Sequence, residues 1–192
     1  MPTVYLDGKS LTLQDVVNVA RKGWKVEISP EAKEQIKECA KAVLAWADEG
    51  RVVYGVTTGF GDLASVVIPR DKCRQLQENL LLSHSCGFGE PYPEDVVRAI
   101  MLLRINTLSR GYSGISSRRS SRWSTTSTSA SIPSSQPSSV GASGDLCPLS
   151  HVAISLIGHG NVVYQQGDAD LRSARQGRNE ARRAPAEGRA RA

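Results

Sequence analysis

The chain of 192 residues lacks any apolar run long enough to cross a membrane, although 40% of its residues are hydrophobic. A membrane-spanning helix needs about 20 consecutive apolar residues, so the sequence predicts a protein with no membrane partner. The first residues, MPTVYLDGKSLTLQD, contain neither a basic start nor an apolar stretch. Because secretory signals need both, we expect a cytoplasmic location.

Cysteine is scarce, and its spacing excludes two common kinds of site. The four cysteines are widely and irregularly spaced: Cys39, Cys73, Cys86 and Cys147. No two of them are separated by two residues, which is the spacing that zinc sites and redox motifs share. We therefore expect reduced thiols in a reducing compartment and no metal site.

A continuous basic face is also missing, despite a net charge of +5. Residues 116–139 hold three arginines and no acid, and residues 167–192 hold seven arginines against four acids. The rest of the chain is close to neutral. The first of these segments superficially resembles a disordered RNA-binding tail, but its arginines are few and Trp123 is its only aromatic residue for stacking on bases. We therefore expect no nucleic-acid partner.

The first 115 residues carry the local signals of a mainly α-helical domain. Apolar residues at helical spacing predict helices at residues 10–21 and 30–49, between Pro69 and Cys86, and at 94–110. Ser29 and Pro30 provide an N-cap and a first helical residue for the second of these helices. The apolar run at 52–56 predicts a small amount of strand.

Three further segments follow this domain. Residues 116–139 contain twelve serines and three threonines, so they cannot bury enough apolar area to offset the entropy of ordering, and we expect disorder there. Residues 140–166 read as a Gly/Ser turn followed by an apolar helix. Residues 167–192 form an anomalous tail rich in arginine and alanine.

Four short sequence segments point to a protein family more specifically than the composition does. The string VGASGDLCPLSH occupies residues 140–151, although an Ala-Ser-Gly triplet alone is typical of a tight turn before a helix. The others are YGVTTGFG at 54–61, NLLLSH at 79–84 and RINTLSRGYSG at 104–114. In this order the four strings resemble the aromatic amino acid ammonia-lyase family, over most of residues 1–115 and 139–164. The resemblance implies the N-terminal part of a helical-bundle ammonia-lyase fold.

The resemblance implies a self-made electrophile. In the family, an Ala-Ser-Gly triad cyclises to 4-methylidene-imidazole-5-one without any external cofactor; the matching residues here are Ala142, Ser143 and Gly144. The glycine amide nitrogen attacks the alanine carbonyl carbon, so neither residue can be bulky. Loss of water from the serine side chain then leaves the methylidene. Asp145 could orient this loop or cap the following helix.

Two upstream residues match the family's catalytic and substrate positions. Tyr54 is the candidate base that removes the β-proton of the substrate; a free tyrosine has a pKa of about 10, so such a role requires an environment that stabilises the phenolate. His84 is the candidate substrate-binding residue, because a polar ring buried in a pocket needs a hydrogen-bonding partner. Members that act on histidine or tyrosine have a histidine here.

The resemblance therefore implies elimination of ammonia from L-histidine to give urocanate, a step of histidine catabolism. The sequence at residues 87–91, Gly-Phe-Gly-Glu-Pro, is similar to that of bacterial members that act on histidine. Action on tyrosine or phenylalanine, or an aminomutase outcome, is the alternative within the family.

The sequence also departs from the family pattern. Members are homotetramers that run several hundred residues further, so a chain of this extent is expected to be an inactive fragment. A Ser/Arg-rich sequence at 116–139 stands where the family has an amphipathic helix and a short apolar strand, and it has nearly the same length. A compensated pair of frameshifts would produce this pattern. A further frameshift near Gln165 would explain the tail. The alternative from another class of protein is a non-catalytic, truncated remnant of such an enzyme.

Overall fold

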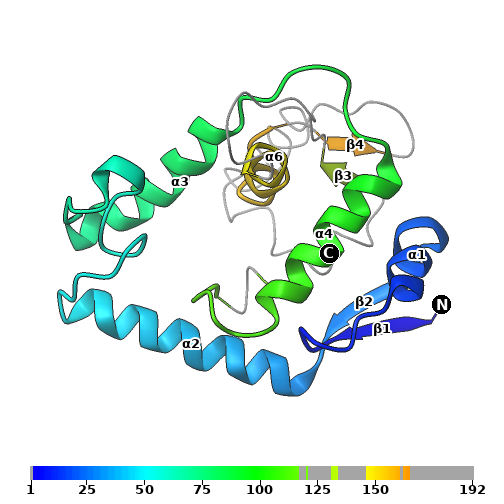
Figure 1. The fold of residues 1–192 in the computed structure, drawn as a ribbon, viewed down its shortest axis with the longest axis horizontal. Coiled ribbons are helices and arrows are strands. Elements are labelled where there is room, and N and C mark those ends of the chain that lie inside the picture. The colour runs from blue at the N-terminus through cyan, green and yellow to red at the C-terminus, as the bar shows by residue number, and fades with distance from the viewer. Residues whose placement is uncertain (1, 117–119, 121–130, 134–145, 161, 165–192) are drawn as a thin grey trace, which may run out of the picture.

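The computed structural model describes residues 2–116, 120, 131–133, 146–160 and 162–164. The triad Ala142–Gly144, Asp145, most of 116–139 and the tail 167–192 lie outside the described residues, so the predictions made for them are not tested here. Helices dominate what is described (Figure 1), which confirms the mainly α-helical prediction. The helices are α1 (Leu13–Lys22), α2 (Pro30–Asp48), α3 (Cys73–His84), α4 (Glu94–Leu108) and α6 (Leu146–Leu156), with short 3₁₀ turns η1 (Gly61–Leu63) and η2 (Arg70–Lys72).

Capping residues decide where the first two helices begin. Helix α1 starts three residues later than predicted, because Thr12 and Asp15 form a capping box: Asp15 N donates to Thr12 Oγ1 (3.2 Å) and Thr12 N donates to Asp15 Oδ2 (3.0 Å). Helix α2 begins as predicted. The Ser29 hydroxyl accepts from Ala32 N (3.2 Å), and Pro30 is its first residue.

The predicted strand at 52–56 is wrong. Val53 O accepts from both Val56 N (3.1 Å) and Thr57 N (3.0 Å), so this run folds into a turn. The Thr57 hydroxyl also accepts from Val53 N (2.9 Å). The apolar side chains are therefore part of a compact turn, and the backbone groups that a strand would offer to a neighbour are already bonded locally.

Strand structure lies elsewhere, in two small sheets. Strands β1 (Thr3–Leu6) and β2 (Lys25–Ile28) pair in parallel, and α1 connects them. Val4 lies opposite Val26 and Leu6 opposite Ile28, and these alternate side chains are the buried ones. Strands β3 (Ser131–Pro133) and β4 (Val162–Tyr164) pair antiparallel.

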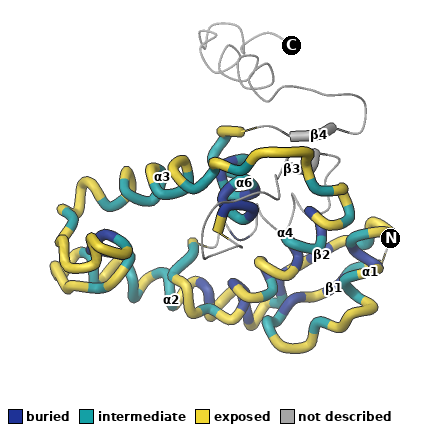
Figure 2. Tube along the Cα trace, turned by 45° about the horizontal axis from the view of Figure 1, so that its top comes forward, coloured by how far each residue is buried: buried dark blue, intermediate teal, exposed yellow. Residues whose placement is uncertain are grey.

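The hydrophobic core gathers around α4. Met101, Leu102 and Ile105 are fully buried, and they belong to one cluster with the inner face of the β1–β2 pair and with residues of α1, α2 and α6. Figure 2 shows buried residues concentrated there, whereas α3 and the segment between α2 and α3 are mostly half-buried or exposed. Helix α3 contains no fully buried residue. Of the helices described, none is long and apolar enough to cross a membrane.

Candidate functional site

The tyrosine loop, residues 54–61, lies between α2 and η1 and is held by two buried threonines. The Thr57 hydroxyl donates to Arg51 O (2.6 Å) and accepts from Val53 N. The Thr58 hydroxyl accepts from Gly55 N (3.1 Å) and donates to Gly59 O (3.0 Å). Both side chains are nearly inaccessible, at 5% and 1% exposure. Each hydroxyl therefore both donates to and accepts from backbone groups, and these bonds stabilise the fold of the loop.

Two glycines of the tyrosine loop occupy positions that a larger residue could not. Gly55 has φ +71°, and a Cβ there would lie 2.9 Å from Phe60 Cε1. A Cβ on Gly59 would lie 2.7 Å from both Leu63 Cβ and Leu63 O. The glycines therefore let the loop fold back on η1 and on its own aromatic residue.

Tyr54 stands at the surface of this loop. Its side chain is 63% exposed, and its ring meets that of Phe60 edge to face, with centroids 5.8 Å apart and planes at 72°. This contact packs the ring against Phe60 and leaves the residue largely open to solvent. A base must reach a proton on a bound molecule; the exposed ring is accessible to one, and the role of Tyr54 stays a prediction.

A side chain of α3 ties the tyrosine loop to the helix that carries His84. Gln77 Nε2 donates to Gly55 O (2.9 Å). Gln77 and His84 are seven residues apart on α3, about 10 Å along the helix axis. One hydrogen bond therefore links the two upstream site segments that the sequence predicted. Gln77 was missed because its partner is 22 residues away and the sequence carries no local sign of the bond.

His84 ends α3 with a defined ring orientation. Its Nδ1 lies 2.9 Å from Leu80 O and 3.1 Å from Ser83 Oγ. A carbonyl oxygen can only accept, so Nδ1 carries the proton. In the neutral ring Nε2 then has a free lone pair. His84 thus offers an acceptor at the end of α3.

Beyond His84, the chain is bonded to α6, the helix that follows the triad in sequence. Gly87 N donates to His151 Nε2 (3.0 Å) across 64 residues. Cys147, one turn earlier on α6, has hydrogen-bonding partners in the Cys86 thiol and in the backbone of Cys86 and Gly87. His151 is the last residue of the motif at 140–151, and no role was predicted for it from the sequence.

Burial sets the protonation of these α6 side chains. It lowers the pKa of His151 from its ordinary value, which favours the neutral ring that the Gly87 bond requires. Burial also raises the pKa of the Cys147 thiol, and the neighbouring Cys86 raises it further. Both groups are therefore held in their neutral forms.

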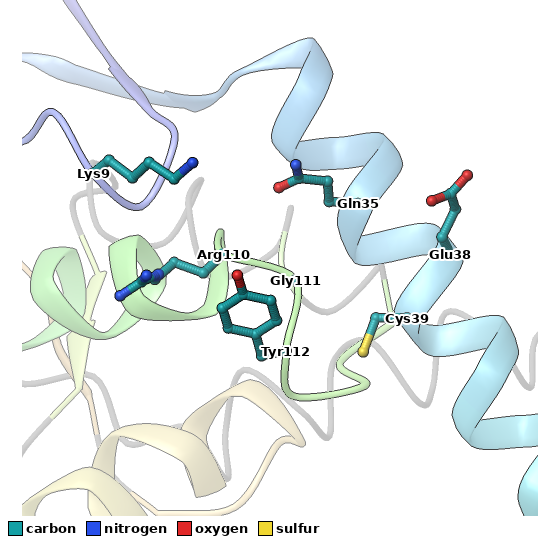
Figure 3. Close-up of a pocket in the computed structure, with 7 residues that line it drawn as sticks. All are labelled: Lys9, Gln35, Glu38, Cys39, Arg110, Gly111 and Tyr112. Carbon is teal, nitrogen blue, oxygen red and sulfur yellow. The ribbon is translucent and has the colours of Figure 1, made fainter.

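One hollow elsewhere in the described residues does not form a site of this kind. A hollow of about 270 Å³ lies between α2 and the turn after α4, lined by Lys9, Gln35, Glu38, Cys39, Arg110, Gly111 and Tyr112. Figure 3 shows the Arg110 guanidinium and the Glu38 carboxylate pointing away from one another, so its charged groups do not converge on a ligand. Within the described ranges, no group of three or more His, Cys, Asp or Glu side chains could hold a metal ion.

Comparison with known proteins identifies the class. The family model for aromatic amino acid lyases matches residues 11–191. A histidine ammonia-lyase from Alkaliphilus oremlandii (strain OhILAs) is 45% identical over 172 residues, which covers 86% of this chain and 33% of that protein. The tyrosine aminomutase from Streptomyces globisporus has the same fold, with a TM-score of 0.84, 32% identity, and coverage of 93% of this chain and 34% of the other.

A second solved structure, histidine ammonia-lyase from Trypanosoma cruzi, superposes with a TM-score of 0.80 at 31% identity, covering 91% of this chain and 34% of that one. The chain belongs to the aromatic amino acid lyase family. It spans about a third of the length of the curated relatives that it matches. The roles of Tyr54, His84 and the triad in this chain remain predictions.

Proposed function

We propose that this chain serves the elimination of ammonia from L-histidine, with Tyr54 as the base and His84 as the residue that binds the substrate ring. The observation that carries the proposal is the placement of both residues on segments that the Gln77–Gly55 hydrogen bond joins. Family membership supports the reaction class, and the identity to curated histidine ammonia-lyases supports histidine as the substrate.

The orientation of His84 supports a substrate with a polar ring. With Nδ1 bonded to Leu80 O, Nε2 of the neutral ring can accept a hydrogen bond from a substrate N–H or O–H group. The imidazole of histidine and the phenol of tyrosine each carry such a donor, and the ring of phenylalanine does not. An unpartnered acceptor in a pocket disfavours an apolar ring, because the acceptor would lose its hydrogen bond to water.

The electrophile would come from Ala142, Ser143 and Gly144. Their types fit cyclisation, since the two residues that must approach each other lack bulk. Helix α6 begins at Leu146, two residues after Gly144 in the sequence. The partially positive N-terminal end of a helix stabilises negative charge, so it would favour the charge that develops on the electrophile when the substrate amine adds to it. When formed, the methylidene group makes the substrate amine a better leaving group. Tyr54 would take the β-proton, and His84 would orient the ring.

A chimera tests the roles of Tyr54 and His84 directly. Residues 1–115 of this chain would replace the matching segment of the Alkaliphilus relative, and ammonia release would be measured with histidine, tyrosine and phenylalanine. We expect activity on histidine that His84→Leu lowers by about 100-fold in kcat/KM, because a buried hydrogen bond to the substrate is lost.

The controls separate a failure of the graft from a failure of the proposal. The parent relative shows that the assay works, and Lys33→Ala, at an exposed position of α2 outside the tyrosine loop, serves as a neutral substitution in the grafted segment. A folded chimera without activity on histidine, beside an active parent, would refute the proposal. A preference for tyrosine would instead favour the alternative within the family, action on tyrosine.

We also propose that the active assembly is a homotetramer. Exposed apolar side chains gather in and beside the tyrosine loop: Val52, Tyr54, Leu63, Val66 and Val67 are 45–68% exposed. Apolar groups collected in this way are typical of a surface that further protein covers. Light scattering on the active chimera tests this: a mass of four chains is expected, and an active monomer would contradict it.

A further inference from the structure

The position of the segment after His84 depends on a side chain from a distant part of the sequence. Helix α3 ends with its own short-range bonds, as Ser85 Oγ donates to Leu81 O (2.6 Å) and Ser85 N to Leu82 O (3.3 Å). Two residues later, Gly87 N donates to His151 Nε2 (3.0 Å). Gly87 is therefore held by a group that belongs to α6 and not by its neighbours in sequence.

This bond is part of a wider contact between α3 and α6. The two helices pack together, and Figure 1 shows α6 beside the end of α3. Cys147 and His151 are four residues apart, so they lie on the same face of α6. Both meet the Cys86–Gly87 segment. The end of the His84-bearing helix is thus fixed at two points on the first turns of α6.

The chemistry of the contact requires an acceptor at residue 151. The Gly87 amide can only donate, so Nε2 of His151 must be unprotonated and its proton must be on Nδ1. Desolvation of the half-buried ring favours that neutral form. A leucine would fill the space without an acceptor, whereas the amide oxygen of a glutamine can replace Nε2.

We propose that His151 is a positioning residue for the substrate side of the site: through Gly87, it sets the place of His84 relative to the helix that follows the triad. His151 does not touch the substrate in this arrangement. It acts through the four-residue connection from His84 to Gly87. The proposal rests on the proposed function only in giving His84 a substrate to bind; the link itself is a property of this chain.

The test uses the 192-residue chain and nuclear magnetic resonance, so that it does not depend on activity. Two signals are followed: hydrogen exchange of the Gly87 amide and the ring resonances of His84. In His151→Leu we expect exchange at Gly87 to be on the order of tenfold faster, as loss of one hydrogen bond allows, and the His84 ring signals to shift. His151→Gln should restore both to their wild-type values.

Two further variants complete the design. His159→Leu removes an exposed imidazole from the turn after α6 and should leave both signals unchanged. His151→Asn keeps an amide but is one methylene shorter than glutamine, so it should behave like the leucine variant, and it replaces that variant if the leucine variant does not fold.

The outcomes are distinct. Unchanged Gly87 exchange in both His151→Leu and His151→Asn would overturn the link, and faster exchange with unmoved His84 signals would overturn the positioning role. Absence of ammonia release from the chimera would count against the proposed function and leave these signals as valid as before.

Discussion

Replacing Thr58 by valine tests whether the tyrosine loop is held as described. The hydroxyl of Thr58 accepts from Gly55 N and donates to Gly59 O, in a side chain that is 1% exposed. Valine has nearly the same volume, so the substitution removes two hydrogen bonds without creating a cavity. Each such bond contributes about 1 kcal/mol net. We therefore expect Thr58→Val to lower the free energy of unfolding by about 2 kcal/mol.

Urea denaturation provides the assay. With a slope of about 2 kcal/mol per molar urea, the midpoint should fall by about 1 M at an unchanged slope. Thr107→Val is the matched control, because Thr107 is exposed and its hydroxyl donates to Leu103 O in its own helix (3.0 Å); we expect a change within about 0.5 kcal/mol. Equal midpoints for wild type and both variants would refute the account of the loop.

Three other predictions concern the core, the base and the pH dependence of stability. Leu102→Ala should cost about 2–5 kcal/mol in urea denaturation, since Leu102 is fully buried, whereas its neighbour Leu103, 51% exposed, should tolerate alanine within about 1 kcal/mol. Tyr54→Phe in the chimera should keep the contact with Phe60 and the stability, but reduce ammonia release by about 100-fold or more, and full activity would remove Tyr54 from the mechanism. Burial lowers the pKa of His151, so the unfolded chain binds a proton at this residue more readily than the folded chain does. The free energy of unfolding of the wild type, relative to that of His151→Gln, should therefore be constant above a pH of about 6.5 and fall as the pH drops below it. A difference that stays constant down to a pH of about 4 would contradict this.

The helices could be predicted from sequence because their signals are local. Ser29 and Pro30 mark the start of α2, and Gly23 ends α1 with φ +68°. The strands could not be predicted in this way. β1 and β2 have four residues each, and what makes them strands is a parallel pairing across α1. The run at 52–56 was misjudged because a threonine side chain bonds its backbone.

The candidate site divides along the same line. Tyr54 and His84 were proposed from the sequence because each lies inside a segment that resembles a family motif, and their roles stay predictions. Gln77 and His151 could not be predicted, because their partners are Gly55 and Gly87, at separations of 22 and 64 residues. A hydrogen bond between a side chain and the backbone across such a sequence separation leaves no pattern in one sequence. His151 was visible only as the last residue of the motif at 140–151.

The mass of the peptide that contains residues 140–151, released from the purified folded chain, shows whether the triad has cyclised. Cyclisation of Ala142, Ser143 and Gly144 removes one water molecule and dehydration of the serine removes another. We expect a wild-type peptide that is lighter than its sequence by two water molecules, and a Ser143→Ala peptide that lacks the serine dehydration. An unmodified wild-type peptide from a folded chain would contradict the claim that this chain makes its own electrophile.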